Sequence, residues 1–129
     1  MYVVADDMVR LEFIAEMHVS SYTNDDIEYM KELLKSTRGL ISEGAELTLY
    51  ASCKYLIAHI ASEYQKACLL EPISREIPKD VRLLFYGASR RLIPQIFNNC
   101  NSSDLEGYIA SSLSTLYSNI LEKKMGVTL

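Results

Sequence analysis

Tryptophan is absent from the sequence, and only five glycines and three prolines are spread over its 129 residues. Because glycine and proline interrupt regular structure, their scarcity in a chain rich in Leu, Ala, Glu and Lys favours long helices over many short strands and turns. Nine tyrosines without a tryptophan give no pattern typical of an aromatic cage. The composition therefore predicts a helical protein.

Long apolar runs are also lacking. None approaches the ~20 residues of a membrane span, and Met1 to Asp7 show neither the basic segment nor the apolar core of a signal peptide. We therefore expect a cytoplasmic protein that does not contact a membrane. Apolar residues make up 49% of the chain and charged residues 23%, which is typical of a globular protein. The length suits a single helical domain over residues 1–129.

Cysteine and histidine are too few, and too far apart, for familiar sites. Cys53, Cys68 and Cys100 are odd in number, and their spacing fits neither a disulfide framework nor the close pairs of a zinc site. His59 and Glu63 have an i,i+4 spacing, but no HExxH pattern surrounds them. A glycine-rich phosphate loop and a GxSxG motif are absent too. We expect no catalytic residue, metal, cofactor or small-molecule substrate, and hence no enzyme.

Apolar residues recur at helical spacing along most of the chain. The prediction is an all-α fold, a compact bundle of five or six helices with a long central helix. A strand is an alternative for residues 1–5. The predicted helices cover residues 9–19, 24–38, 45–70, 79–100 and 105–124.

Local signals set the predicted helix boundaries. Thr23 or Asn24 is expected to cap the second helix, and Ser102 or Ser103 the last one. Gly39 is expected to stop the second helix, and Ser42-Glu43-Gly44 to precede the central helix, which Pro72 ends. Pro94 is expected to kink or divide the fourth helix.

Positive charge is gathered in one part of an otherwise acidic chain. The net charge is −4, yet residues 75–91 contain five cations and only two carboxylates. At ~100° per residue, Lys79, Arg82, Tyr86 and Arg90 share one face of the predicted helix, and Arg91 adjoins it. We expect an apolar opposite face made of Val81, Leu84, Phe85, Ala88 and Leu92.

A second cationic stripe follows the predicted helix before Gly39. Lys31, Lys35 and Arg38 are spaced by four and three residues, which places them on one side of that helix. Lysine and arginine at such spacing suit a phosphate backbone, and Tyr86 or Tyr55 suits an unpaired base. A solvated helix face paired with Glu28 and Glu32 is the simpler interpretation of Lys31 and Lys35.

Several hydrophobic patterns follow one another along the chain. They are a helix leading into Leu40-Ile41-Ser42-Glu43-Gly44, then Leu47 to Tyr50, then Tyr55-Leu56-Ile57-Ala58-His59-Ile60, and a final amphipathic helix from Tyr108 to Lys124. In this order the features resemble the small helical subunit of type III CRISPR effector complexes. The resemblance covers about two thirds of the chain and consists mainly of hydrophobic patterns.

The resemblance implies a non-enzymatic subunit, used in antiviral defence, whose copies stack along a complex and support RNA through basic side chains. The residues that it carries over are Lys31, Lys35, Arg82, Arg90 and Arg91. This chain departs from the family in being acidic overall. Its final helix also lacks an aromatic residue followed by Lys or Arg near its end.

Two functions are therefore expected from the sequence. The first is a helical subunit of a ribonucleoprotein assembly, with other protein subunits and the RNA backbone as partners. The second is a protein–protein interaction module that binds an amphipathic helix and does not contact nucleic acid. Exposed methionines would serve this second function, with Met8, Met30 and Met125 as candidates.

Overall fold

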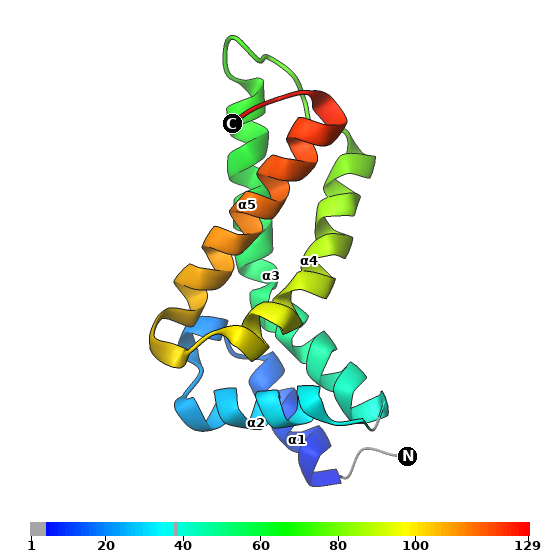
Figure 1. Cartoon of the computed structure of the whole chain (residues 1–129), viewed down its shortest axis with the longest axis vertical. Helices are drawn as coiled ribbons and strands as arrows, with labels where there is room; N and C mark the ends of the chain where they lie inside the picture. Colours follow the sequence, from blue (N-terminus) through cyan, green and yellow to red (C-terminus); the bar gives the residue numbers. More distant parts are fainter. Residues whose placement is uncertain (1–4, 38) are drawn as a thin grey trace.

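The computed structural model describes residues 5–37 and 39–129, and these form helices joined by short connectors (Figure 1). No strand occurs among them, so the predicted all-α bundle is confirmed with five α-helices. The predicted site residue Arg38 lies outside the described residues. The alternative strand at residues 1–5 also lies outside them, except for Ala5, which is helical. The α-helices are α1 (Ala5–Ala15), α2 (Asn24–Lys35), α3 (Gly39–Leu69), α4 (Lys79–Asn99) and α5 (Leu105–Met125).

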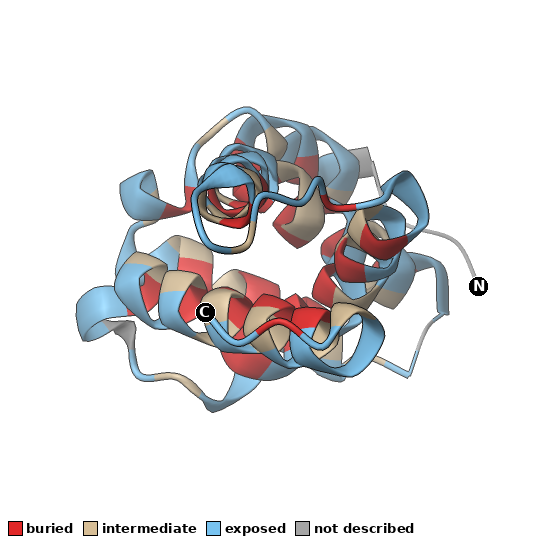
Figure 2. Cartoon of the chain, turned by 90° about the horizontal axis from the view of Figure 1, so that it is seen from above, coloured by how far each residue is buried: buried red, intermediate tan, exposed pale blue. Residues whose placement is uncertain are grey.

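The 31-residue α3 is the central helix, and α1, α2, α4 and α5 all contact it. Its upper part runs beside α4 and α5, while α1 and α2 surround its lower part (Figure 1). Buried residues lie on the sides of the helices that face one another (Figure 2). The largest fully buried side chains come from all five of these helices, and include Ile14, Met30, Phe85, Phe97 and Tyr117. Each such side chain contributes about 1.5–3 kcal/mol by leaving water.

The central helix begins earlier than the sequence predicts. Gly39 starts α3 and does not end α2, and Ser42-Glu43-Gly44 is helical. Two observations explain the difference: Ile41 and Ala45 are buried on the same helix face, and the Ser42 hydroxyl donates to the Ser36 carbonyl. Burial and this hydrogen bond together outweigh the local turn propensity of the segment.

The other boundaries follow from capping chemistry. Thr23 caps α2 as predicted, because its hydroxyl accepts from the Asp26 amide while the Asp26 carboxylate accepts from the Thr23 amide. The last helix is capped by Asp104, whose carboxylate accepts from the Gly107 amide, and not by the predicted serines. Gly126, with φ of 67°, closes α5 in the left-handed conformation that glycine tolerates.

The first helix spans Ala5–Ala15 rather than 9–19, so Asp6 and Asp7 lie in its first turn. The fourth helix continues through Pro94 without a break. Its yellow C-terminal part runs at an angle to its green N-terminal part in Figure 1, as expected for a proline-containing helix.

Candidate nucleic-acid interface

The predicted cationic face lies on α4, whose opposite face joins the core. Val81, Phe85, Ser89 and Ile93 are buried at helical spacing. Leu84, which was expected on the inner face, is exposed. The core-facing arc of α4 is therefore centred on Phe85, and the cations flank it.

A furrow made of three separate hollows follows the seam between α3 and α4. Ala58 and Tyr86 line both of the upper two hollows, and Tyr50 of the middle hollow lies one helical turn from Glu46 of the lowest. From Glu46 to Lys66 the furrow follows twenty residues of α3, or roughly 30 Å. We call it the α3–α4 furrow and define it by the charged and aromatic residues that line it: Glu46, Tyr50, Lys54 and Lys66 of α3, and Arg82, Tyr86, Arg90 and Arg91 of α4.

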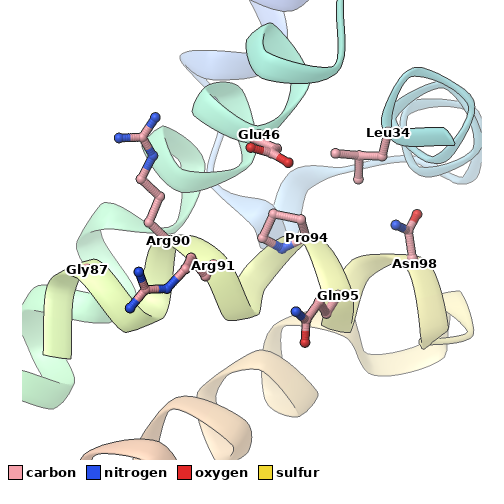
Figure 3. A pocket seen from close by; sticks show the side chains of 8 residues that line it. All are labelled: Leu34, Glu46, Gly87, Arg90, Arg91, Pro94, Gln95 and Asn98. Atoms are coloured by element: carbon pink, nitrogen blue, oxygen red, sulfur yellow. The ribbon is translucent and has the colours of Figure 1, made fainter. Parts of the chain in front are cut away.

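The widest hollow, of about 640 Å³, forms the lower end of the furrow (Figure 3). Arg90 and Arg91 project from α4 at one side of it, and Glu46 of α3 and Leu34 of α2 lie across from Pro94. Asn98 and Gln95 add amide groups to the same hollow. The lining thus offers several hydrogen-bond donors beside two guanidinium groups.

Positive charge dominates the α3–α4 furrow, with five cations against the single carboxylate of Glu46. The ion pairs found among the described residues are Arg10 with Asp26 at 4.0 Å and Lys66 with Glu63 at 3.4 Å. Arg90 and Arg91 therefore have no ion-pair partner within residues 5–37 and 39–129. The Lys66 pair is exposed, so a competing anion replaces Glu63 at little cost.

Arg82 is half-buried in the upper part of the furrow, where Lys66 and Tyr86 line the same hollow. Its Nε atom is buried and has no hydrogen-bond partner among the described residues. A buried donor of a charged group is costly to leave unpaired. The Arg82 guanidinium also has no ion-pair partner among the described residues, so its charge is available to an anion that binds in this hollow.

The remaining predicted cations lie elsewhere. Lys79 is exposed at the first residue of α4 and lines none of the three hollows. Lys31 donates to the Cys100 carbonyl at 3.0 Å and so ties α2 to the connector after α4. Lys35 is exposed at the end of α2.

Lys54, Lys66 and Tyr50 were not predicted as site residues, although they form the α3 side of the furrow. A sequence signal for them exists: Tyr50, Lys54, Ala58, Ser62 and Lys66 recur every four residues. Apolar residues occupy a wide arc of α3 on both sides of this stripe, so the hydrophobic periodicity of the sequence does not single it out. Only the pairing of α3 with α4 brings the two cationic faces together.

The other sequence candidates have structural surroundings of their own. His59 and Glu63 are exposed, and Glu63 contacts Lys66. No group of three or more His, Cys, Asp or Glu that could hold a metal ion occurs in the described ranges. Burial raises the pKa of the Cys53 thiol to about 12, which disfavours the thiolate. Among the same residues, no helix is both long and apolar enough to cross a membrane.

Neither a protein-family model, nor a curated protein, nor a solved structure matches this chain. The resemblance to the small subunit of type III CRISPR complexes therefore stays a prediction.

Proposed function

We propose that this chain is a non-enzymatic helical subunit of a ribonucleoprotein assembly, and that it holds RNA by its phosphate backbone in the α3–α4 furrow. The observation that carries the proposal is the excess of cations over carboxylates along this one seam. A phosphate backbone presents negative charge at regular intervals. The cations from Lys54 to Lys66 span roughly 18 Å of α3, and those from Arg82 to Arg91 span roughly 14 Å of α4, so together they neutralise more than one phosphate. Such binding depends on charge and not on base identity.

Two further observations support the proposal. The half-buried Arg82 has an Nε donor without a partner, and the two arginines at the lower end have no described carboxylate partner. Guanidinium groups bind phosphate with planar, bidentate hydrogen bonds. The furrow therefore offers charge, donors and an accessible surface in one place.

The test is a fluorescence-anisotropy titration of labelled single-stranded RNA of about 15 nucleotides, near the upper end of known site sizes. The variant R90Q/R91Q removes two furrow cations. It is expected to weaken binding about tenfold or more, and to reduce the slope of log K against log salt by about 1.4. The matched control K123Q/K124Q removes two exposed charges at the end of α5.

The control is expected to keep most of the affinity and the salt slope, because Lys123 and Lys124 lie outside the furrow. The two variants have the same net charge, so a difference between them reports position and not overall charge. An equal loss in both variants, or no binding by the unchanged protein, contradicts the proposal.

The second candidate is a protein–protein interaction module, and the outer face of α1 favours it. Phe13 is 70% exposed, Val9 is exposed one helical turn before it, and Met8 is exposed further round the helix. Exposed carboxylates of Glu12 and Glu16 adjoin these apolar side chains. Of the candidate methionines, Met30 is fully buried and Met125 half-buried, which leaves Met8.

The only cation of α1, Arg10, is engaged within the chain. Its guanidinium lies 3.9 Å from the centre of the Tyr29 ring and pairs with Asp26. The free part of the surface is therefore apolar and acidic. This chemistry suits a partner helix with an apolar stripe flanked by lysine or arginine. Protein contact through α1 and RNA contact through the furrow are compatible in one subunit.

A further inference from the structure

Both histidines of the chain lie beside the same tyrosine. The His18 ring meets the Tyr55 ring edge-on, with centroids 5.5 Å apart and planes at 81°. The His59 ring is nearly parallel to Tyr55, with centroids 6.5 Å apart and planes at 10°. All three side chains are exposed, and Tyr55 is 66% exposed. We call these three residues the aromatic platform.

The aromatic platform lies outside the α3–α4 furrow but includes two residues of α3 that adjoin furrow residues in the sequence. Lys54 and Ala58, which line the furrow, directly precede Tyr55 and His59 in α3. At about 100° per residue, Tyr55 is rotated by ~100° from Lys54 and by ~60° from Ala58 around the helix axis. A strand that leaves the furrow over α3 therefore meets the Tyr55 ring within the next helical turn.

Packing within the chain does not explain the platform. The hydroxyls of Tyr22, Tyr29 and Tyr64 hydrogen-bond to Ser52, Asp7 and the Ser114 carbonyl, so these rings have structural roles. No such bond is found for Tyr55 among the described residues. A large aromatic side chain at this exposure adds little to the stability of the fold. Most of its surface is exposed, while His59 lies parallel to the ring and His18 meets it edge-on.

We propose that the aromatic platform stacks an unpaired base of the strand held in the α3–α4 furrow, which makes single-stranded polynucleotide the substrate class. This inference rests on the proposed function. Aromatic faces stack on bases of any identity, and the base must be unpaired to present its own face. The paired bases of a duplex are already stacked on one another and cannot use the platform.

The chain offers a direct optical test, because it contains no tryptophan. Tyr55→Trp places a single indole in the platform, and a stacked base is expected to quench its fluorescence. Tyr108→Trp is the matched control, since Tyr108 is 53% exposed and lies on α5, outside the furrow. Quenching by single-stranded RNA at position 55 but not at position 108 is the expected result.

Affinity measurements complete the test. Tyr55→Ala is expected to weaken single-strand binding about tenfold with an unchanged salt slope, because the ring carries no charge. Tyr55→Phe keeps the ring and is expected to keep the affinity, and Tyr108→Ala is expected to have no effect. A strand of the same length without bases, and a duplex, should bind Tyr55→Ala and the unchanged protein equally well. A DNA strand of the same sequence shows whether the sugar contributes.

The inference and the proposed function fail in different ways. If Tyr55→Ala behaves like Tyr108→Ala while R90Q/R91Q still reduces the salt slope, the platform proposal is overturned and the furrow stands. The platform proposal is also overturned if Tyr55→Ala weakens duplex and single strand alike, or if RNA quenches both tryptophans equally. If RNA does not bind the unchanged protein, both proposals fall.

Discussion

Two tyrosines in contact at the centre of the bundle should respond in opposite ways to the loss of their hydroxyl groups. The rings of Tyr64 and Tyr117 have centroids 5.2 Å apart. Tyr64 donates to the Ser114 carbonyl at 2.9 Å, and its oxygen lies 2.7 Å from the Ser118 hydroxyl. The hydroxyl of Tyr117 is buried and has no partner among the described residues.

The two matched substitutions are Tyr117→Phe and Tyr64→Phe, and both keep the ring. Tyr117 is fully buried and stacks on Phe85 with centroids 4.0 Å apart, so phenylalanine retains its packing. Removing an unpaired buried hydroxyl recovers part of a desolvation cost of about 1–3 kcal/mol. We expect Tyr117→Phe to raise the free energy of unfolding by about 1 kcal/mol.

Tyr64→Phe removes a hydroxyl with two partners and leaves the Ser118 hydroxyl without one of its own. This change is expected to lower the free energy of unfolding by about 1 kcal/mol. The two variants should therefore differ by about 2 kcal/mol. At an m-value of about 2 kcal/mol per molar urea, their unfolding midpoints should differ by about 1 M.

Urea unfolding followed by circular dichroism measures both midpoints, and equal m-values show that the unfolded state is unchanged. The reasoning is refuted if Tyr117→Phe destabilises the protein as much as Tyr64→Phe does. That result would mean that the Tyr117 hydroxyl has a partner, such as the nearby Arg82. Burial raises the pKa of Tyr117 to about 12, and the positive charge of Arg82 opposes this rise.

Two other predictions concern pH and the outer face of α1. Burial raises the pKa values of Cys53, Cys68, Tyr22, Tyr29 and Tyr117, so the unfolded chain loses these protons at lower pH than the folded one. Stability should consequently fall as pH rises above about 9, by up to ~1.4 kcal/mol per pH unit for the buried Cys53 thiol. Cys53→Ala should reduce the fall between pH 9 and 10, and a flat profile in urea titrations contradicts this. Phe13→Ser should change the free energy of unfolding by less than about 0.5 kcal/mol, against a loss of about 3 kcal/mol for the buried Ile14→Ala. Phe13→Ser should also abolish the binding of a synthetic Leu/Lys amphipathic helix, as measured by calorimetry. Unchanged binding argues against α1 as the docking face.

The fold was largely predictable because its main signals are local. Apolar residues at helical spacing placed all five helices, and Thr23 with Asp26 gave a capping box that needs no tertiary partner. The start of α3 was not predictable in the same way. Gly39 and Gly44 are typical turn residues, and the burial of Ile41 and Ala45, together with the hydrogen bond from Ser42 to Ser36, makes the segment helical.

The candidate site was half predictable for a related reason. Arg82, Tyr86 and Arg90 share a face of one helix, and periodicity alone finds such a face. Lys54 and Lys66 recur every four residues with Tyr50, Ala58 and Ser62, but this signal is weak because apolar residues cover most other sides of the same helix. Their place opposite α4 depends on how two helices pair, and periodicity carries no information about pairing.

An acidic net charge is compatible with phosphate binding because the charges are separated along the molecule. Residues 5–37 contain eight carboxylates and three cations, whereas residues 39–129 contain nine of each. Charges on the surface are screened over about 8 Å at physiological ionic strength, so a phosphate in the furrow responds to the furrow cations more than to α1 and α2. The acidic lower end of the molecule in Figure 1 should then disfavour a strand that runs past Glu46 towards α2. This asymmetry favours a strand that lies towards Lys54, Lys66 and Arg82, away from α1 and α2.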